Sequence, residues 1–70
     1  MDKPKPKREV AIRGYSKLAG VIFFDSSQDA ADEFQEFGYI IRSYSEYSYT
    51  LYIDARFDFG EVLAYVENYG

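Results

Sequence analysis

Two stretches near the start of the chain have the pattern of β-strands. Residues 9–13 alternate weakly between polar and apolar side chains, and residues 18–24 form a continuous apolar run rich in β-branched and aromatic residues. A run of this kind is typical of a central strand that is covered on both faces. Residues 14–17 between them are few enough for a hairpin turn, so the two strands are expected to pair antiparallel.

The segment that follows has the spacing of an amphipathic helix. Ser26 can cap its first turn, with Asp29 three residues later, and Gly38 suits the position just after its last turn. Apolar and acidic side chains fall on opposite sides of this helix at helical intervals. The apolar side holds Ala30, Ala31, Phe34 and Phe37, and the acidic side holds Asp29, Asp32, Glu33 and Glu36.

Residues 39–57 form a tyrosine-rich stretch without Gly or Pro that is too long for one strand of a small domain. Polar residues at 45–48 predict a turn there, which divides the stretch into two strands. The second half alternates, but the register across the turn is open by one residue, and that residue decides which tyrosines are buried. Asp58, with Glu61 three residues later, repeats the capping pattern and predicts a short helix to the C-terminal end.

The order β-β-α-β-β-α predicts an α+β domain of the ferredoxin-like two-layer type. The N-terminal strand takes the edge place that the last strand usually holds, so a four-stranded antiparallel sheet carries both helices on one face and leaves the other open to solvent or a partner. We assign residues 9–70 to this single domain, and residues 1–8, which mix Pro with Lys, to a disordered basic tail. The expected core consists of Val21 or Ile22, Phe24, Phe34, Phe37, Leu51 or Ile53, Val62 and Val66.

The composition excludes the commonest catalytic and metal sites. The 70 residues include no Cys and no His, so thiolate zinc sites and histidine general bases are absent. There is no phosphate-binding glycine loop and no calcium-loop spacing. The core must depend on eight Tyr and six Phe. We expect no enzyme, no cofactor and no metal.

The charge is divided unevenly along the chain. Residues 1–13 contain five basic residues and two acidic ones, a net charge of +3, whereas residues 14–70 contain three basic and ten acidic ones, a net charge of −7. A short basic arm can contact nucleic acid, but it can equally lie on the acidic body of its own domain. No run approaches the ~20 apolar residues of a membrane helix, and no signal-peptide pattern follows the basic start. We expect a cytoplasmic location and no membrane partner.

Part of the chain resembles the RNA-recognition motif. Residues 13–15 and 18–31 are similar to a basic-Gly-aromatic strand that runs into an acidic-Ser turn and an Asp-Ala helix, and residues 51–53 are similar to the short signature of that family. The two segments occur in reverse chain order, as in a permuted domain. The resemblance implies a sandwich fold and base stacking on exposed strand aromatics, for which Tyr52 and Phe23 are the residues present.

One catalytic alternative involves Asp25, which is expected at the end of the central strand. A homodimer could bring two copies of this carboxylate together and hold Mg²⁺ for phosphodiester cleavage. The simpler interpretation is that Asp25 ends the strand and that its negative charge interacts favourably with the N-terminus of the following helix.

Two groups of side chains are candidates for binding a partner. The acidic side of the first helix, which consists of Asp29, Asp32, Glu33 and Glu36, contains no Lys or Arg, although like charges four residues apart destabilise a helix. Tyrosines are enriched at the centres of protein interfaces, because they offer a large rigid area. The hairpin tyrosines expected to be exposed are Tyr44, Tyr47, Tyr49 and Tyr52.

We therefore predict a small acidic protein-binding domain whose partner is a larger basic protein, such as a nucleic-acid-binding complex. Phage-encoded inhibitors of host defence, including anti-CRISPR and DNA-mimic proteins, have this size and charge, and they act in the host cytoplasm. The alternatives are a permuted nucleic-acid-binding module that uses the basic tail and Tyr52, and the dimeric nuclease. The net charge of −7 on residues 14–70 opposes the nucleic-acid-binding module, since phosphate contacts dominate the affinity of such modules. The sequence is also compatible with a homodimer.

Overall fold

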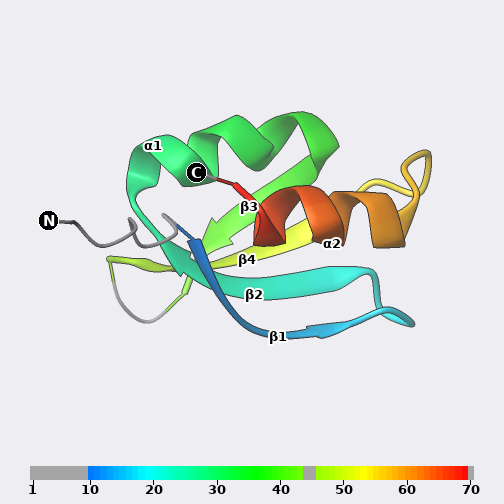
Figure 1. Cartoon of the computed structure of the whole chain (residues 1–70), viewed down its shortest axis with the longest axis horizontal. Coiled ribbons are helices and arrows are strands. Elements are labelled where there is room, and N and C mark those ends of the chain that lie inside the picture. The colour runs from blue at the N-terminus through cyan, green and yellow to red at the C-terminus, as the bar shows by residue number, and fades with distance from the viewer. Residues whose placement is uncertain (1–9, 44–45, 70) are drawn as a thin grey trace, which may run out of the picture.

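The computed structural model describes residues 10–43 and 46–69. Its elements form an α+β arrangement of four strands and two α-helices, with one 3₁₀ segment between them, which confirms the predicted class (Figure 1). The basic tail assigned to residues 1–8 lies outside the described residues. In chain order the elements are β1 (Val10–Ser16), β2 (Val21–Ser26), α1 (Gln28–Glu33), η1 (Phe34–Phe37), β3 (Gly38–Arg42), β4 (Ser48–Ile53) and α2 (Phe59–Glu67).

The four strands form one sheet in the order β1-β2-β4-β3, and each neighbouring pair is antiparallel. The two central strands pair with Phe24 opposite Tyr49 and with Ile22 opposite Leu51. The β1–β2 register shifts between Ile12 and Gly14, as at a β-bulge. Because of this extra residue, Ile12 and Tyr15 both lie on the inner side of β1, although they are three residues apart. The Tyr15 ring packs on Phe59 of α2, with ring centroids 5.7 Å apart.

The first hairpin differs from the sequence prediction. The turn covers residues 17–20 rather than 14–17, and Leu18, expected in the central strand, is fully exposed in that turn. Gly20 explains the position of the turn. It adopts φ 71°, a left-handed conformation that glycine takes at no steric cost, and its N–H donates to the Ser16 carbonyl oxygen at 2.8 Å.

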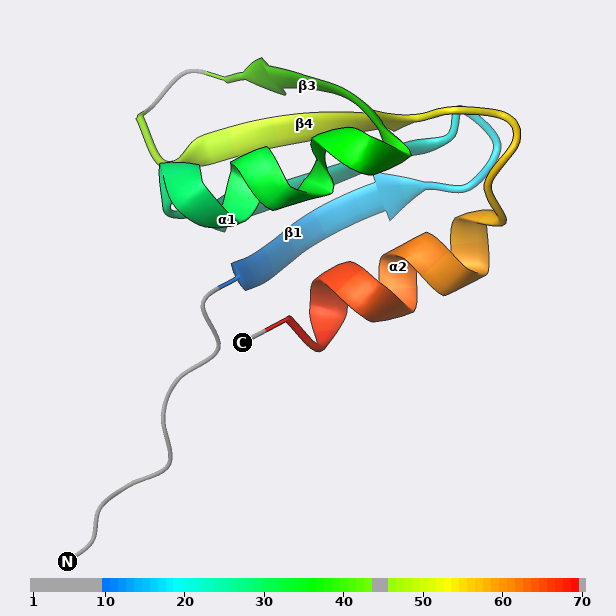
Figure 2. The ribbon, with the colours of Figure 1, turned by 90° about the horizontal axis from the view of Figure 1, so that it is seen from above.

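The core is one cluster of side chains that come from the strands and from both helices. Seen from above in Figure 2, α1 lies across the strands and α2 runs beside β1. Phe24 and Phe34 are fully buried and meet edge to face, with ring centroids 5.4 Å apart. The predicted core is confirmed for most of its members, and Phe37 and Ile53 pack against it partly buried. The fully or nearly buried members are Val10, Ile22, Phe24, Ala30, Ala31, Phe34, Tyr49, Leu51, Val62 and Val66.

The predicted caps are right for α2 and wrong by one residue for α1. The Asp58 carboxylate accepts a hydrogen bond from the Glu61 N–H at 3.0 Å, as the sequence predicts. The first helix is capped by Ser27, whose hydroxyl oxygen accepts from the Ala30 N–H at 3.2 Å. Ser26 instead remains in β2 and is buried, because β2 extends two residues further than its apolar run.

Gly38 also has a role other than the predicted one. Its φ of 164° is ordinary extended backbone, so it begins β3 and does not form a left-handed helix end. A Cβ at this position would overlap the Tyr52 carbonyl oxygen and lie 2.9 Å from the Asp54 backbone nitrogen. Glycine is therefore required here by the close approach of β4.

The packing of Phe34 generates a stability prediction. Replacing Phe34 with Ala should lower the free energy of unfolding by about 3–5 kcal/mol, because the cavity would remove the ring contacts with Phe24 and Tyr69. Urea unfolding followed by circular dichroism measures this loss. Phe23→Ala, which removes a ring that is 40% exposed, is the matched control and should cost much less. Equal losses for the two variants would show that Phe34 is not a central core residue.

Candidate functional site

The four predicted carboxylates lie along one exposed strip on α1 and η1. Asp29 is in the first turn of α1, and Glu36 is in η1, while Ala30, Ala31 and Phe34 of the same segment are buried. We name this group the acidic strip: Asp29, Asp32, Glu33 and Glu36, all exposed to solvent.

Within the described part of the chain, no cation neutralises the acidic strip. The polar side-chain contact found there is a hydrogen bond from the Gln35 amide nitrogen to the Asp32 carboxylate at 3.3 Å. Neither α1 nor η1 has a basic residue in its last turn. Asp29 and Glu33 are four residues apart on α1, so they repel each other by a few tenths of a kcal/mol. Among the described residues, the negative charge of the strip is therefore not offset by an ion pair.

The predicted tyrosines do not form one surface. Tyr47 is 60% exposed in the turn before β4, and Tyr52 is 45% exposed on β4. Tyr44 lies outside the described residues. Tyr52 alternates with the buried Leu51, so it points away from the core that α1 covers. The structure thus separates Tyr52 from the acidic strip.

Tyr49 corrects the prediction, because it is only 4% exposed. Its ring stacks on Phe24, with centroids 5.7 Å apart, and its hydroxyl donates to the Glu46 carbonyl oxygen at 3.3 Å. Buried in this way, Tyr49 has no surface to offer a partner. The sequence left the hairpin register open by one residue, and the pairing with β2 places Tyr49 inward and Tyr52 outward.

A second candidate surface covers the face of the sheet turned away from the core, which we name the outer face. Phe23, Ile41 and Tyr52 are 40–45% exposed there, and Tyr39 is 66% exposed. Sequence reasoning missed Tyr39 and Ile41, because β3 is apolar on both faces and its alternation gives no direction. By register, the outer face consists of Ala11, Arg13, Gly14, Ser16, Val21, Phe23, Asp25, Tyr39, Ile41, Ser48, Thr50 and Tyr52.

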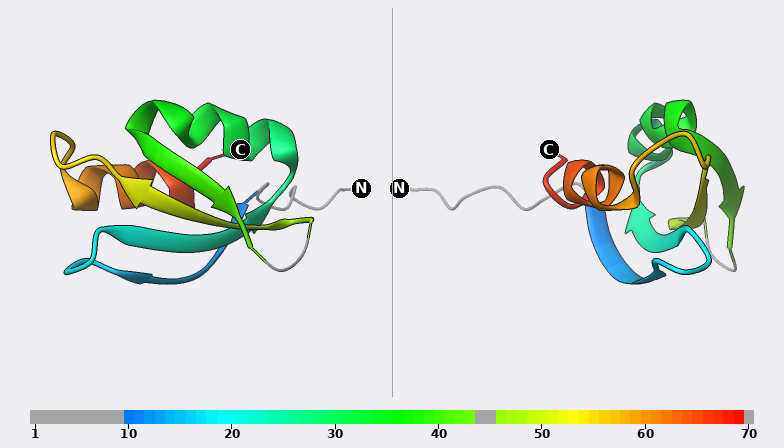
Figure 3. Two further views of the ribbon diagram at one scale, coloured as in Figure 1. Left: turned by 180° about the vertical axis from the view of Figure 1, so that it is seen from behind. Right: turned by 90° about the vertical axis from the view of Figure 1, so that its right-hand side faces the viewer.

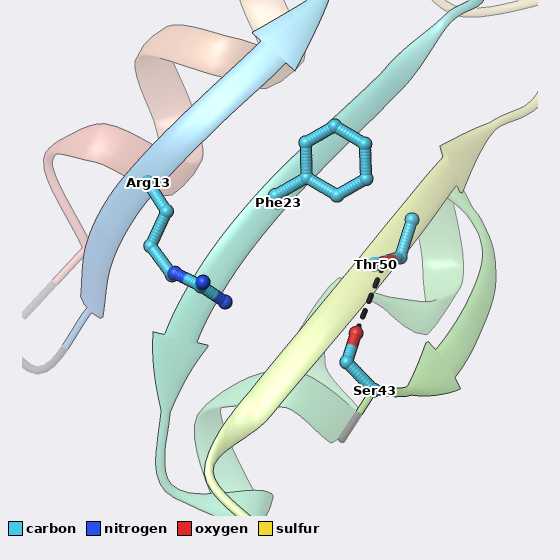
Figure 4. A pocket seen from close by; sticks show the side chains of 4 residues that line it. All are labelled: Arg13, Phe23, Ser43 and Thr50. Atoms are coloured by element: carbon cyan, nitrogen blue, oxygen red, sulfur yellow. Dashed lines mark hydrogen bonds between the residues drawn. The ribbon is translucent and has the colours of Figure 1, made fainter. Parts of the chain in front are cut away.

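The outer face contains an open hollow of about 350 Å³, lined by Arg13, Phe23, Ser43 and Thr50 (Figure 4). The hydroxyls of Ser43 and Thr50 lie 3.2 Å apart and share a hydrogen bond. Phe23 projects from the central strand between Arg13 on one side and Thr50 on the other. The hollow therefore combines an aromatic ring with hydroxyl groups.

Arg13, Asp25 and Ser48 form a polar network at one end of the outer face. The Asp25 carboxylate accepts from the Ser48 hydroxyl at 2.9 Å and lies 3.6 Å from a guanidinium nitrogen of Arg13. The same Arg13 nitrogen is 3.5 Å from the Ser48 hydroxyl. Asp25 is therefore the next-to-last residue of β2, and its carboxylate contacts two neighbouring strands.

The network bears on the nuclease alternative. Residues 10–43 and 46–69 contain no group of three or more Asp and Glu side chains placed to hold a metal ion. A dimeric magnesium site at Asp25 would also place the metal close to a cation, since an Arg13 guanidinium nitrogen lies 3.6 Å from the same carboxylate.

Comparison with known proteins gives no match among protein families, curated proteins or solved structures. In the part of the chain that the structure describes, no helix has the length and apolar character needed to cross a membrane. The functional interpretation therefore rests on the geometry of the two surfaces.

The Arg13–Asp25–Ser48 network generates a prediction that also tests the nuclease alternative. Asp25→Ala should lower the free energy of unfolding by about 1 kcal/mol, because it removes a charge-assisted hydrogen bond that is partly screened by solvent. A double-mutant cycle with Ser48→Ala, followed by urea unfolding, should return a favourable coupling energy. Mg²⁺-dependent cleavage of DNA or RNA by the unmodified chain, abolished by Asp25→Ala at unchanged stability, would instead establish the nuclease.

Proposed function

We propose that the chain is a small acidic protein-binding domain that occupies a basic site on a larger partner and has no catalytic activity of its own. The observation that carries this proposal is the acidic strip, whose four carboxylates are exposed on one side of α1 and η1.

The electrostatics of the acidic strip favour a basic partner. Like charges along one helix side destabilise the free domain slightly, and a cationic surface would convert that repulsion into attraction. Residues 14–70 carry a net charge of −7, so the field of the whole body adds to that of the strip. A field of one sign raises the rate of association with an oppositely charged protein, most strongly at low salt.

The size and charge of the chain support a more specific form of the proposal. A domain of 8.1 kDa with a pI of about 4.6 is comparable to phage-encoded inhibitors that imitate the charge of DNA. The partner of such an inhibitor is a basic protein of a nucleic-acid-binding complex, in the cytoplasm of the host. In this proposal the acidic strip occupies the place of a phosphate backbone.

We also propose that the fold is a ferredoxin-like sandwich in which β1 replaces the usual last strand. The sheet order β1-β2-β4-β3 supports this assignment, since β1 then lies beside the first strand of the β2-α1-β3-β4-α2 unit. The views in Figure 3 support the placement of α1 and α2 on the same side of the sheet. This arrangement would leave the outer face uncovered.

Charge reversal tests the acidic strip. The double variant Asp32→Lys, Glu33→Lys should fold normally and should bind its basic partner, isolated from host lysate on the immobilised chain, at least about tenfold more slowly at low salt. Stopped-flow association at several salt concentrations measures the effect, and the difference from the unmodified chain should shrink as salt rises.

The matched control is Glu46→Lys, Glu67→Lys, which changes the net charge equally at two exposed residues outside the strip. This control should slow association much less. If both double variants associate at the same rate, the net charge and not the acidic strip determines binding. An unchanged rate in the strip variant would contradict the proposed function.

A second candidate is the permuted nucleic-acid-binding module. Phe23 and Tyr52 favour it, because they project from the neighbouring central strands β2 and β4 and are 40% and 45% exposed. Rings in such positions can stack on the bases of a single strand. The outer face offers one cation, Arg13, and this side chain lies 3.6 Å from the Asp25 carboxylate. We therefore rank this candidate second.

Titration with a single-stranded RNA oligonucleotide distinguishes the two candidates. We expect no binding whose affinity falls steeply with salt, since phosphate contacts require several cations and the outer face offers Arg13 alone, which is paired with Asp25. Fluorescence anisotropy of a labelled eight-nucleotide RNA, between low and physiological salt, measures this. Salt-dependent binding that Tyr52→Ala abolishes and Tyr47→Ala leaves intact would establish the second candidate.

A further inference from the structure

Four of the eight exposed large hydrophobic side chains in the described structure lie on the outer face, and the proposed acidic strip does not use this surface. Phe23, Ile41, Tyr39 and Tyr52 lie next to one another across β2, β4 and β3. Tyr39 and Tyr52 are opposite each other, with ring centroids 6.4 Å apart. Contiguous exposed aromatic and aliphatic side chains of this kind mark interaction surfaces.

The charge of the outer face identifies which partner fits. Among its described strand positions the charged side chains are Arg13 and Asp25, one of each sign, and they are paired. The whole chain carries a net charge of −4, so two copies repel each other over most of their surfaces. The neutral outer face is where a second copy can approach without that repulsion. A phosphate backbone, by contrast, would find no unpaired cation there.

The outer face has exposed rings at one end and a hollow further from that end. At one end, Tyr39 and Tyr52 raise the surface beside Val21. Two residues before Tyr52, β4 has the smaller side chain of Thr50. The hollow opens over Thr50 and Ser43. A two-fold axis that lies in the interface between these two ends would place the raised end of each copy over the hollow of the other.

We propose that the outer face is the interface of a symmetric homodimer, in which Tyr52 and Tyr39 of each copy enter the hollow of the second copy. The sheets pack face to face, as in a β-sandwich, and bury the exposed rings. The hydroxyls of Ser43 and Thr50 at the base of the hollow offer hydrogen-bond partners to a tyrosine hydroxyl.

The size of the outer face sets the strength of this dimer. Four strands of five to seven residues span about 20 by 20 Å, or roughly 400 Å² for each copy. Stable interfaces bury about 800 Å² for each partner, so the homodimer belongs to the weak and concentration-dependent class.

Sedimentation velocity over a range of concentrations tests the proposal on the full chain. The unmodified protein should rise from a monomer mass of 8.1 kDa towards twice that value between about 10 µM and 1 mM. Tyr52→Glu should remain monomeric over the same range, because a charge at the centre of the interface weakens it by about tenfold or more.

Leu18→Glu is the matched control, since it adds the same charge at a fully exposed residue of the β1–β2 turn. This control should dimerise like the unmodified chain. A monomer mass for the unmodified protein at every concentration would overturn the proposal. So would equal dimerisation of Tyr52→Glu and Leu18→Glu.

A second measurement needs no substitution at the interface. Amide NMR signals of the unmodified chain should shift on dilution, and the shifts should concentrate at Phe23, Tyr39, Ile41, Thr50 and Tyr52. Shifts confined to the acidic strip or to the outer edge of β3 would place the contact elsewhere and contradict the proposal. Failure of the acidic strip to bind a basic partner leaves these measurements unaffected, so the two proposals fail independently.

Discussion

The packing of Phe24 determines which face of the two central strands points inward. This ring is fully buried between Phe34, which meets it edge to face at 5.4 Å, and Tyr49, which stacks on it at 5.7 Å. Aromatic pairs in these geometries contribute beyond the area that they bury. Because Phe24 and Tyr49 are opposite each other on β2 and β4, their inward position fixes the register of the two central strands. Phe23 and Tyr52 are then placed on the outer face.

The same aromatic cluster connects the two helices of a domain that has no disulfide to support it. Phe34 contacts Tyr65 at 6.0 Å and Tyr69 at 5.1 Å, and Phe37 contacts Tyr65 at 5.2 Å. A segment from the middle of the chain therefore meets the C-terminal segment through rings. Large rigid side chains bury much area for little loss of conformational freedom, which suits a chain of 70 residues.

Charge and apolar area are separated on the surface of this small domain. The carboxylates gather on the outer side of α1 and η1, where nothing in the described structure neutralises them. The sheet presents a neutral surface, whose Arg13 and Asp25 satisfy each other at 3.6 Å. One surface can attract a basic partner at long range, whereas the other can associate only by close packing. Two independent interactions are therefore compatible with one compact chain.

The sequence by itself determined the α+β class, the positions of the helices, most of the core and the Asp58 cap, because helical spacing and capping act over three or four neighbouring residues. It also placed the acidic strip, whose exposure follows from the burial of Ala30, Ala31 and Phe34 on the other side. Local patterns did not place the first turn, where Gly20 and the bulge after Ile12 decide the outcome.

Only the tertiary structure separated the buried Tyr49 from the exposed Tyr52, and only it brought Arg13, Asp25 and Ser48 together from three strands. Alternation shows which residues share a face of a strand, but the face that becomes the core depends on the neighbour that a strand finds across the sheet.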